Sequence, residues 1–198
     1  MSEENLQLPQ PIPYPESCLF KKLLKTPVLL YRLGLGKLFG NYILILSTTG
    51  RKTHKTHRTP VEYFLHEGKY YIVSGFGERP DWYQNILENP QVTLQNGYEQ
   101  VCAIARPPQT DVEWEAIILY LAHSPVGNLL IADSLEGQSQ AETIEQIKTW
   151  PILTFDPTDE SCPSPLEADL VWAWPLILLG MAFDITFLWL ICKKKSKK

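Results

Sequence analysis

Basic and hydroxyl side chains are concentrated in one short stretch of the chain. Residues 47–63, STTGRKTHKTHRTPVEY, include Arg51, Lys52 and Arg58, although the whole chain has a net charge of −4. Gly50 allows a turn in which several backbone N–H groups point at one place, and guanidinium, ammonium and hydroxyl groups beside them can bind a phosphate or carboxylates. The stretch is therefore a candidate anion-binding turn. A solvated basic hairpin is the alternative interpretation.

The composition limits the classes of ligand and partner that such a site could bind. Of the 198 residues, 44% are apolar and 20% are charged, which is typical of a chain that builds a hydrophobic core. A pI near 5.6 argues against a broad surface for nucleic acid. The four histidines have no metal-ligand spacing, and the four widely separated cysteines are expected to be inert thiols. We therefore expect no metal and no nucleic-acid partner.

Hydrophobic periodicity and turn residues predict mostly strands. Short apolar or alternating runs predict strands at 41–48, 57–67, 68–76, 91–95, 98–107 and 150–157, and helical spacing predicts helices at 79–90 and 111–123. Asn96-Gly97 suits a hairpin turn, and Thr110 with Glu113 has the spacing of a helix capping box. The pattern favours a small antiparallel barrel with helical additions.

The chain divides by composition into five parts. These are a Pro-rich segment 1–17, a globular domain 18–157, an acidic linker 158–169, an apolar segment 170–192 and a basic tail 193–198.

The apolar segment 170–192 is long enough for a helix across a hydrocarbon layer of about 30 Å. Asp184 favours the alternative, a helix buried in protein or in a dimer interface. Upstream, lysines and leucines at helical spacing in 17–40 are typical of an amphipathic helix on a membrane interface, or of a helix that caps the barrel. Without a secretory signal pattern, we expect a cytoplasmic domain that binds membrane lipid through 170–192.

Three motifs occur in a fixed order: STTGRKT at 47–53, RTPVEY at 58–63 and DWYQNILENPQVTL at 81–94. In this order they resemble the deazaflavin (F420)-dependent nitroreductase family, oxidoreductases with a split β-barrel related to FMN-binding proteins. The resemblance is strongest over 46–90 and looser over 19–157. It implies a mainly β fold with α additions, namely a split antiparallel β-barrel (FMN-binding-like) plus helices and the C-terminal apolar helix. It also implies coenzyme F420 as cofactor, with FMN as the alternative.

The resemblance implies roles for four groups of residues. The cofactor's phosphate and acidic tail would meet the turn, its ring would lie along the following strand, backbone N–H groups would approach the ring edge, and a helix start would close the site. These groups are, in that order, Arg51, Lys52 and Thr53; His57, Arg58, Thr59, Pro60, Val61 and Glu62; Ser74, Gly75, Phe76 and Gly77; and Asp81, Trp82, Tyr83, Gln84 and Asn85. Tyr63 is a candidate proton donor, and packing on its strand is its alternative role.

The chain departs from the family pattern at several positions. His54 stands where a glycine is usual, so the turn backbone is open to change. Thr56-His57 replaces the usual Pro-Arg pair. Phe76 and Glu62 stand where the actinobacterial nitroreductases of the family have a serine and a tyrosine. The residues therefore support the cofactor site better than nitroreduction itself.

The leading functional hypothesis is an F420-dependent oxidoreductase. It would pass hydride from the deazaflavin to a small-molecule substrate: a quinone, a nitro compound or an activated alkene. The alternatives are a non-catalytic split-barrel protein that binds flavin, haem or lipid at the membrane, and a membrane adaptor whose basic turn meets an anionic partner. A homodimer is compatible with the resemblance, because split-barrel relatives often dimerise.

Overall fold

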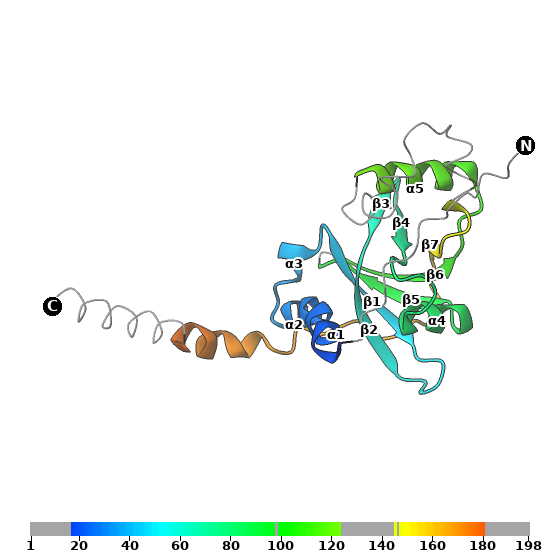
Figure 1. Cartoon of the computed structure of the whole chain (residues 1–198). Helices are drawn as coiled ribbons and strands as arrows, with labels where there is room; N and C mark the ends of the chain where they lie inside the picture. Colours follow the sequence, from blue (N-terminus) through cyan, green and yellow to red (C-terminus); the bar gives the residue numbers. More distant parts are fainter. Residues whose placement is uncertain (1–16, 98, 124–144, 146, 181–198) are drawn as a thin grey trace, which may run out of the picture.

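The computed structural model describes residues 17–97, 99–123, 145 and 147–180 (Figure 1). Within these ranges, seven strands form one antiparallel sheet with helices around it. The elements are α1 (Cys18–Leu24), α2 (Thr26–Arg32), α3 (Gly36–Phe39), β1 (Ile43–Thr49), β2 (Thr56–Glu62), β3 (Phe64–His66), β4 (Lys69–Val73), α4 (Asp81–Glu88), β5 (Gln91–Gln95), β6 (Gln100–Arg106), α5 (Asp111–His123), β7 (Ile152–Pro157) and the 3-10 turn η1 (Val171–Ala173).

The strand order bends the sheet round on itself. The order is β2-β1-β5-β6-β7-β4-β3, so β2 and β3 are the two edges. Only Tyr63 separates these two strands in the chain, and the opposite edges must therefore come close together. The predicted mainly antiparallel β fold with helices is confirmed. The hydrogen-bonded ladder is an open sheet, however, and not a closed barrel.

The β5–β6 hairpin has a longer connection than a two-residue turn. Gln95 pairs with Gln100, and the Asn96 side chain accepts a hydrogen bond from the Glu99 backbone N–H at 3.0 Å. Gly97 has a φ of 88°, which a residue with a side chain rarely adopts. The predicted hairpin is present, and the Asn-Gly pair forms the first part of its connection.

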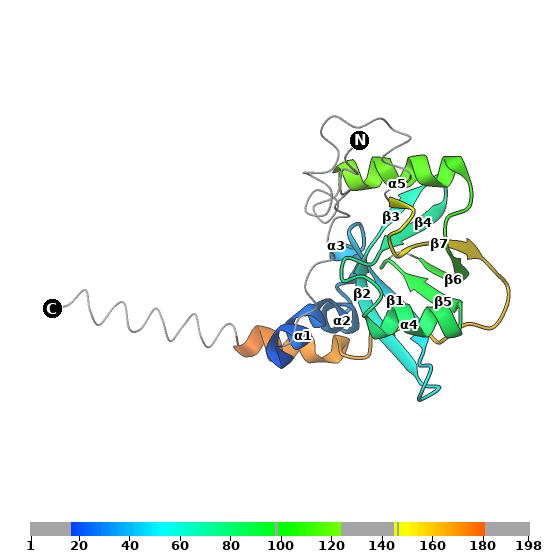
Figure 2. The same ribbon diagram turned by 45° about the vertical axis from the view of Figure 1, so that its right-hand side comes forward.

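Two hydrophobic cores cover opposite faces of the sheet. Strand β4 contributes to both, because its successive side chains alternate between the faces. Helix α4 covers one core and α5 the other, as Figures 1 and 2 show. The first core includes Leu44, Leu46, Tyr70, Ile72, Trp82, Tyr83, Ile86, Val92 and Leu94, and the second includes Tyr71, Trp114, Ile117, Tyr120, Leu121 and Ile152.

A buried acidic residue fixes the start of α5. Glu113 is 2% exposed and accepts hydrogen bonds from the backbone N–H groups of Gln109 (2.8 Å) and Thr110 (3.3 Å). Its own N–H donates to Thr110 Oγ1 at 3.3 Å, which confirms the predicted capping box. Arg106 and Lys69 form ion pairs with the same carboxylate at 2.7 and 2.8 Å.

Residues 158–169, which we call the strap, lie against the sheet although their composition indicates a linker. A disulfide between Cys102 in β6 and Cys162 holds the strap near its start. The expectation of four inert thiols is therefore wrong for these two residues, which are 60 positions apart and meet only in the fold. Further along, Leu166 N–H donates to Gln95 Oε1 at 2.9 Å, and Gln95 Nε2 donates to Leu166 O at 3.0 Å.

The strap leads into a short helical segment beside α2. Leu170 N–H donates to Arg32 O at 3.0 Å, and Trp174 Nε1 donates to Leu33 O at 2.9 Å. Residues 174–180 are helical. In the described part of the chain, no helix has the length and apolar character needed to cross a membrane. The rest of the predicted span, 181–192, lies outside the described residues.

Candidate functional site

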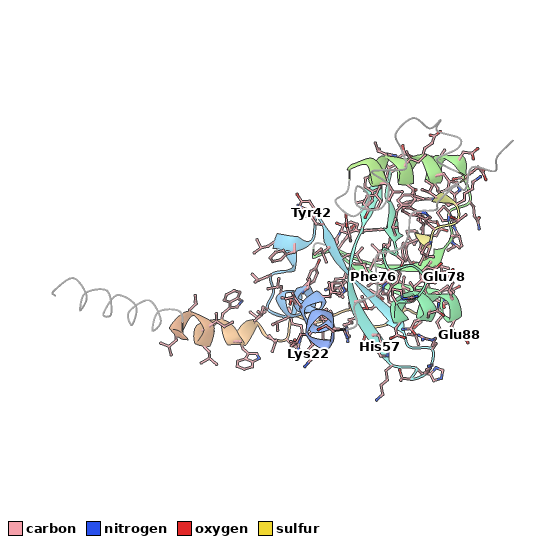
Figure 3. The ribbon with its side chains drawn as sticks, viewed as in Figure 1. Lys22, Tyr42, His57, Phe76, Glu78 and Glu88 are labelled. Atoms are coloured by element: carbon pink, nitrogen blue, oxygen red, sulfur yellow. A yellow bond between two sulfur atoms is a disulfide. The ribbon has the colours of Figure 1, made fainter. Side chains whose placement is uncertain are left out.

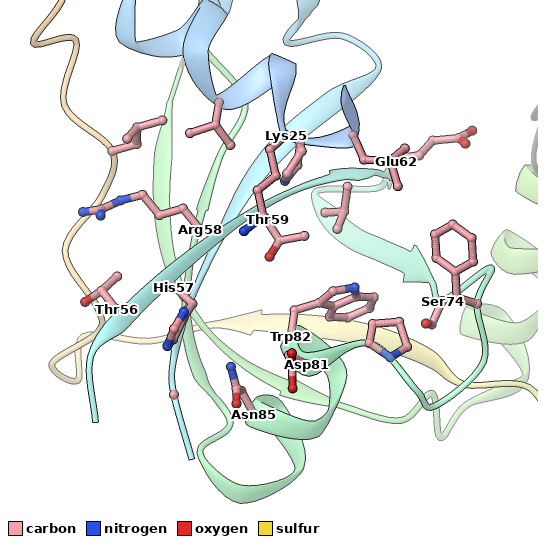
Figure 4. Close-up of a pocket in the computed structure, with 18 of the residues that line it drawn as sticks. Lys25, Thr56, His57, Arg58, Thr59, Glu62, Ser74, Asp81, Trp82 and Asn85 are labelled. Atoms are coloured by element: carbon pink, nitrogen blue, oxygen red, sulfur yellow. The ribbon is translucent and has the colours of Figure 1, made fainter. Parts of the chain in front are cut away.

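A groove with a volume of about 1470 Å³ runs along both sides of the edge strand β2 (Figure 4). Its walls come from six parts of the chain: helices α1 and α2, the turn after β1, β2 itself, residues 73–76, the start of α4, and the end of the strap. Tyr120 of α5 adds one further side chain. Segments far apart in the sequence therefore meet in one cavity.

Strand β2 sends alternate side chains to the two sides of the groove. Val61 packs against the core beneath α4, so Thr59 and His57 point to that side as well. Arg58 points to the opposite side, where its Nη2 donates to Pro165 O of the strap at 3.0 Å. We call the α4 side the inner lobe and the side of α1, α2 and the strap the outer lobe.

The basic turn between β1 and β2 is pinned to α4. Asn85 Oδ1 accepts hydrogen bonds from Arg51 N (3.1 Å) and Arg51 Nη1 (3.0 Å), while Asn85 Nδ2 donates to Thr48 Oγ1 at 3.3 Å. Arg51 Nη2 also forms an ion pair with Asp81 Oδ1 at 3.0 Å. Asp81 therefore offsets part of the Arg51 charge. Lys52, exposed at the groove, is the second cation of this turn.

Close packing within the turn explains its glycine. A Cβ on Gly50 would lie 2.6 Å from the His57 ring and 2.6 Å from Thr53 Oγ1. These two side chains are hydrogen-bonded to each other at 3.0 Å between His57 Nε2 and Thr53 Oγ1. His54 has a φ of 55°, so the turn keeps a left-handed conformation at the position where the family pattern has glycine.

The far wall of the inner lobe is a tight loop after β4. Ser74 is buried, and its Oγ donates to Gly77 O at 2.5 Å, while Gly77 N–H donates to Ser74 O at 2.9 Å. Gln84 Nε2 donates to Glu78 O at 2.8 Å and holds the loop onto α4. Pro80 and Trp82 complete an apolar wall, and Figure 4 shows Trp82 between His57 and Ser74.

The outer lobe combines apolar side chains with an ion pair. Arg32 of α2 makes two hydrogen bonds of 2.7 Å to the carboxylate of Asp169 at the end of the strap. The bond to Asp169 raises the pKa of Arg32, and the bond to Arg32 lowers the pKa of Asp169. Lys25 lines the same lobe. The lobe is thus closed by contacts between helices near one end of the chain and a strap near the other.

Fifteen of the nineteen predicted site residues line the groove. They are Arg51, Lys52, Thr53, His57, Arg58, Thr59, Pro60, Val61, Glu62, Ser74, Gly75, Phe76, Asp81, Trp82 and Asn85. Gly77, Tyr83 and Gln84 do not line it, but they shape the loop or the core behind it. Tyr63 also lies outside the groove, and its hydroxyl donates to Gly40 O at 2.5 Å. This contact agrees with the alternative of a packing role for Tyr63 on its strand, and its role as a proton donor stays a prediction.

Sequence reasoning missed most of the outer lobe. The missed residues are Leu24, Lys25, Val28, Leu29, Arg32, Thr56, Leu166, Glu167 and Asp169 there, and Val73, Pro80 and Tyr120 elsewhere in the groove. Leucines and lysines at helical spacing could have indicated the α1–α2 wall. No local pattern could have indicated the strap, because its composition is that of a linker.

Comparison with known proteins agrees with the motifs. Residues 32–122 match the family model described as F420H(2)-dependent quinone reductase. The resemblance to the F420-dependent family that the sequence motifs indicate is confirmed by this match. Within this family, the F420H(2)-dependent quinone reductases of Mycobacterium tuberculosis strains H37Rv and CDC 1551 are each 35% identical to the chain over 69 residues. That alignment covers 33% of this chain and 46% of each relative, so the chain spans about half the length of the relatives it matches.

Solved structures that the comparison matches to the chain have lower sequence identity. An F420-H2-dependent reductase is 22% identical, covers 58% of this chain and 93% of its own, and has a TM-score of 0.44. A haem-binding protein from Mycobacterium smegmatis is 12% identical, covers 63% of this chain and 49% of its own, and has a TM-score of 0.40. These TM-scores are too low to bear on function.

Proposed function

We propose that the protein is an F420-dependent reductase that passes hydride to a quinone, with nitro compounds and activated alkenes as further candidate substrates. The observation that carries this proposal is the convergence of three family motifs on one cavity. The basic turn, the β2 strand and the start of α4 are separate in the sequence, yet all line the inner lobe. The F420-dependent family resemblance rests on these same segments.

The donor set of the inner lobe fits such a cofactor. Arg51, Lys52 and Thr53 supply cations and a hydroxyl at one end, which suits a phosphate or carboxylates. Val61 and Trp82 supply apolar surface further along, which suits a flat ring system. We propose that coenzyme F420 binds with its anionic part at the turn and its ring against β2.

Reduced F420 supplies a hydride when it is bound. The chain's own residues would bind and orient the cofactor and the substrate, and would exclude water from the site. Trp82 and Pro80 keep the inner lobe apolar, and Asn85 holds the turn at a fixed place relative to α4. His57 is held by Thr53 and faces the inner lobe, so we propose that its imidazole carries the proton that accompanies reduction of the substrate.

Removing the two cations of the turn should weaken cofactor binding. The double variant Arg51→Ala, Lys52→Ala should lose about 2–4 kcal/mol of F420 binding free energy, because each charged group contributes a charge-assisted bond. Fluorescence titration with F420 measures this loss. Lys55→Ala is the matched control, since Lys55 is an exposed cation of the same turn that does not line the groove. If both variants bind F420 as tightly as the unmodified chain, the turn is a solvated basic hairpin and not the anion-binding site.

A turnover assay separates the reductase from a binding protein. The full chain should oxidise reduced F420 in the presence of menadione at a rate well above the uncatalysed rate. The return of the absorbance of oxidised F420 measures this rate. His57→Gln should lower the rate while F420 affinity stays within about twofold, because the substitution removes a proton carrier. Tight F420 binding without turnover on quinones, nitroaromatics or enones would favour a non-catalytic binding protein.

A further inference from the structure

Residues 19–42, which include most of helices α1–α3, and residues 171–179 expose large apolar side chains. Leu19 is 78% exposed, Leu38 69%, Tyr42 74% and Trp172 67%. Scattered single leucines are normal on a protein surface, but a concentration of this kind on one side marks an interaction site. We call the following residues the helical surface: Leu19, Leu23, Leu38, Phe39, Tyr42, Val171, Trp172, Leu176, Leu178 and Leu179.

The two parts of the helical surface are held together by specific contacts. The Arg32–Asp169 ion pair and the hydrogen bond from Trp174 to Leu33 O join residues 169–174 to α2. Val171 also packs close to Gly34, where an added Cβ would lie 3.2 Å from Val171 Cγ2. Figures 1 and 2 both show the C-terminal helical segment beside α1 and α2. The two parts of the helical surface therefore lie on the same side of the molecule.

The charge of this side is opposite to that of the chain. Residues 18–42 contain four lysines, one arginine and no acidic residue, whereas the whole chain has a net charge of −4. Lys22, Lys25 and Lys37 are exposed. Figure 3 shows Lys22 and Tyr42 on the helical side, and Glu78 and Glu88 across the sheet near α4. Apolar and basic side chains are thus interleaved on this side of the molecule.

We propose that the helical surface docks on an anionic lipid bilayer. Exposed leucines and aromatic rings would enter the boundary between headgroups and acyl chains, and the lysines would meet anionic headgroups. A second copy of this chain fits less well, because two such surfaces would bring like charges together. The proposal does not rest on the reductase activity. It places the bilayer beside the outer lobe, since Val28 and Leu29 of α2 line that lobe.

Vesicle flotation of the full chain tests the proposal. The chain should bind vesicles of phosphatidylcholine and phosphatidylglycerol in equal parts far more than vesicles of phosphatidylcholine alone. The triple variant Leu19→Gln, Leu23→Gln, Leu38→Gln should lose binding at least about tenfold, because burial of even one leucine is worth that factor. The variant Lys22→Gln, Lys37→Gln should lose about fivefold per lysine, and the loss should disappear at high salt.

The matched control removes three exposed apolar residues elsewhere. Leu65→Gln, Leu87→Gln, Val112→Gln changes residues of β3, α4 and α5 that are 45%, 60% and 59% exposed, and it should bind vesicles like the unmodified chain. Circular dichroism checks that each variant is folded. The proposal is overturned if the α1–α3 leucine variant binds as well as the control. It is also overturned if these leucines instead govern concentration-dependent self-association without lipid.

Discussion

Replacing Gly40 by alanine should destabilise the fold by about 3 kcal/mol or more. An added Cβ would lie 1.6 Å from the carbonyl oxygen of Asn96 and 2.7 Å from its carbonyl carbon. These are backbone atoms of the connection between β5 and β6, so they cannot rotate away as a side chain can. Gly40 has a φ of −62°, which alanine adopts without strain, and steric overlap is therefore the main cause. Urea unfolding measures the loss.

Gly68→Ala is the matched control for this substitution. Gly68 has a φ of 78°, but an added Cβ would meet nothing within 4 Å. It should therefore cost only about 1–2 kcal/mol of backbone strain. If Gly40→Ala loses no more stability than Gly68→Ala, the contact between α3 and the hairpin is looser than described.

The second large effect concerns the carboxylate at the start of α5. Glu113→Gln should reduce the free energy of unfolding by about 2–4 kcal/mol, because it removes the buried negative charge that compensates the partly exposed Arg106 and the more exposed Lys69. Asp156 still pairs with Arg106 at 2.5 Å, which keeps the loss below that of a cation left without any partner. The midpoint of chemical denaturation at neutral pH measures the effect.

The effect of Glu113→Gln should depend on pH in a defined direction. The hydrogen bonds from Arg106 lower the pKa of Glu113 in the folded state, against the opposing effect of burial. A lowered pKa contributes stability that is complete above the unfolded value of about 4.3 and is lost as the pH falls through the folded value. The difference in free energy of unfolding between the unmodified chain and the variant should therefore become smaller below about pH 5. A difference in free energy of unfolding that stays constant from pH 7 into the acid range would contradict this link between the pKa of Glu113 and stability.

Local patterns predicted the elements better than their arrangement. Residues 57–67 were expected to form one strand, and the alternation of side chains is indeed that of a strand. In the structure this run is split at Tyr63 into β2 and β3, which lie at opposite edges of the sheet. The break depends on how the whole sheet bends, and no window of a few residues contains that information.

The inner lobe could be predicted and the contacts of the strap in the outer lobe could not, for a related reason. The turn, β2 and the start of α4 carry recognisable motifs within 46–90. Arg58, assigned to the cofactor by resemblance, donates to Pro165 across 107 positions, and Arg32 meets Asp169 across 137 positions. Neither contact has a local signal. The oligomeric state and the span through 170–192 stay predictions.

The open edge at β2 has a consequence for aggregation. An unpaired edge strand offers its N–H and C=O groups to strands of other molecules, and such pairing starts fibrils. Here Pro60 removes one N–H donor from the middle of β2, and β3 at the other edge is only three residues long. Residues of α2, the strap and α4 also line the groove on the two sides of β2. The edge strand β2 can therefore line a groove while these features hinder the addition of strands from other molecules.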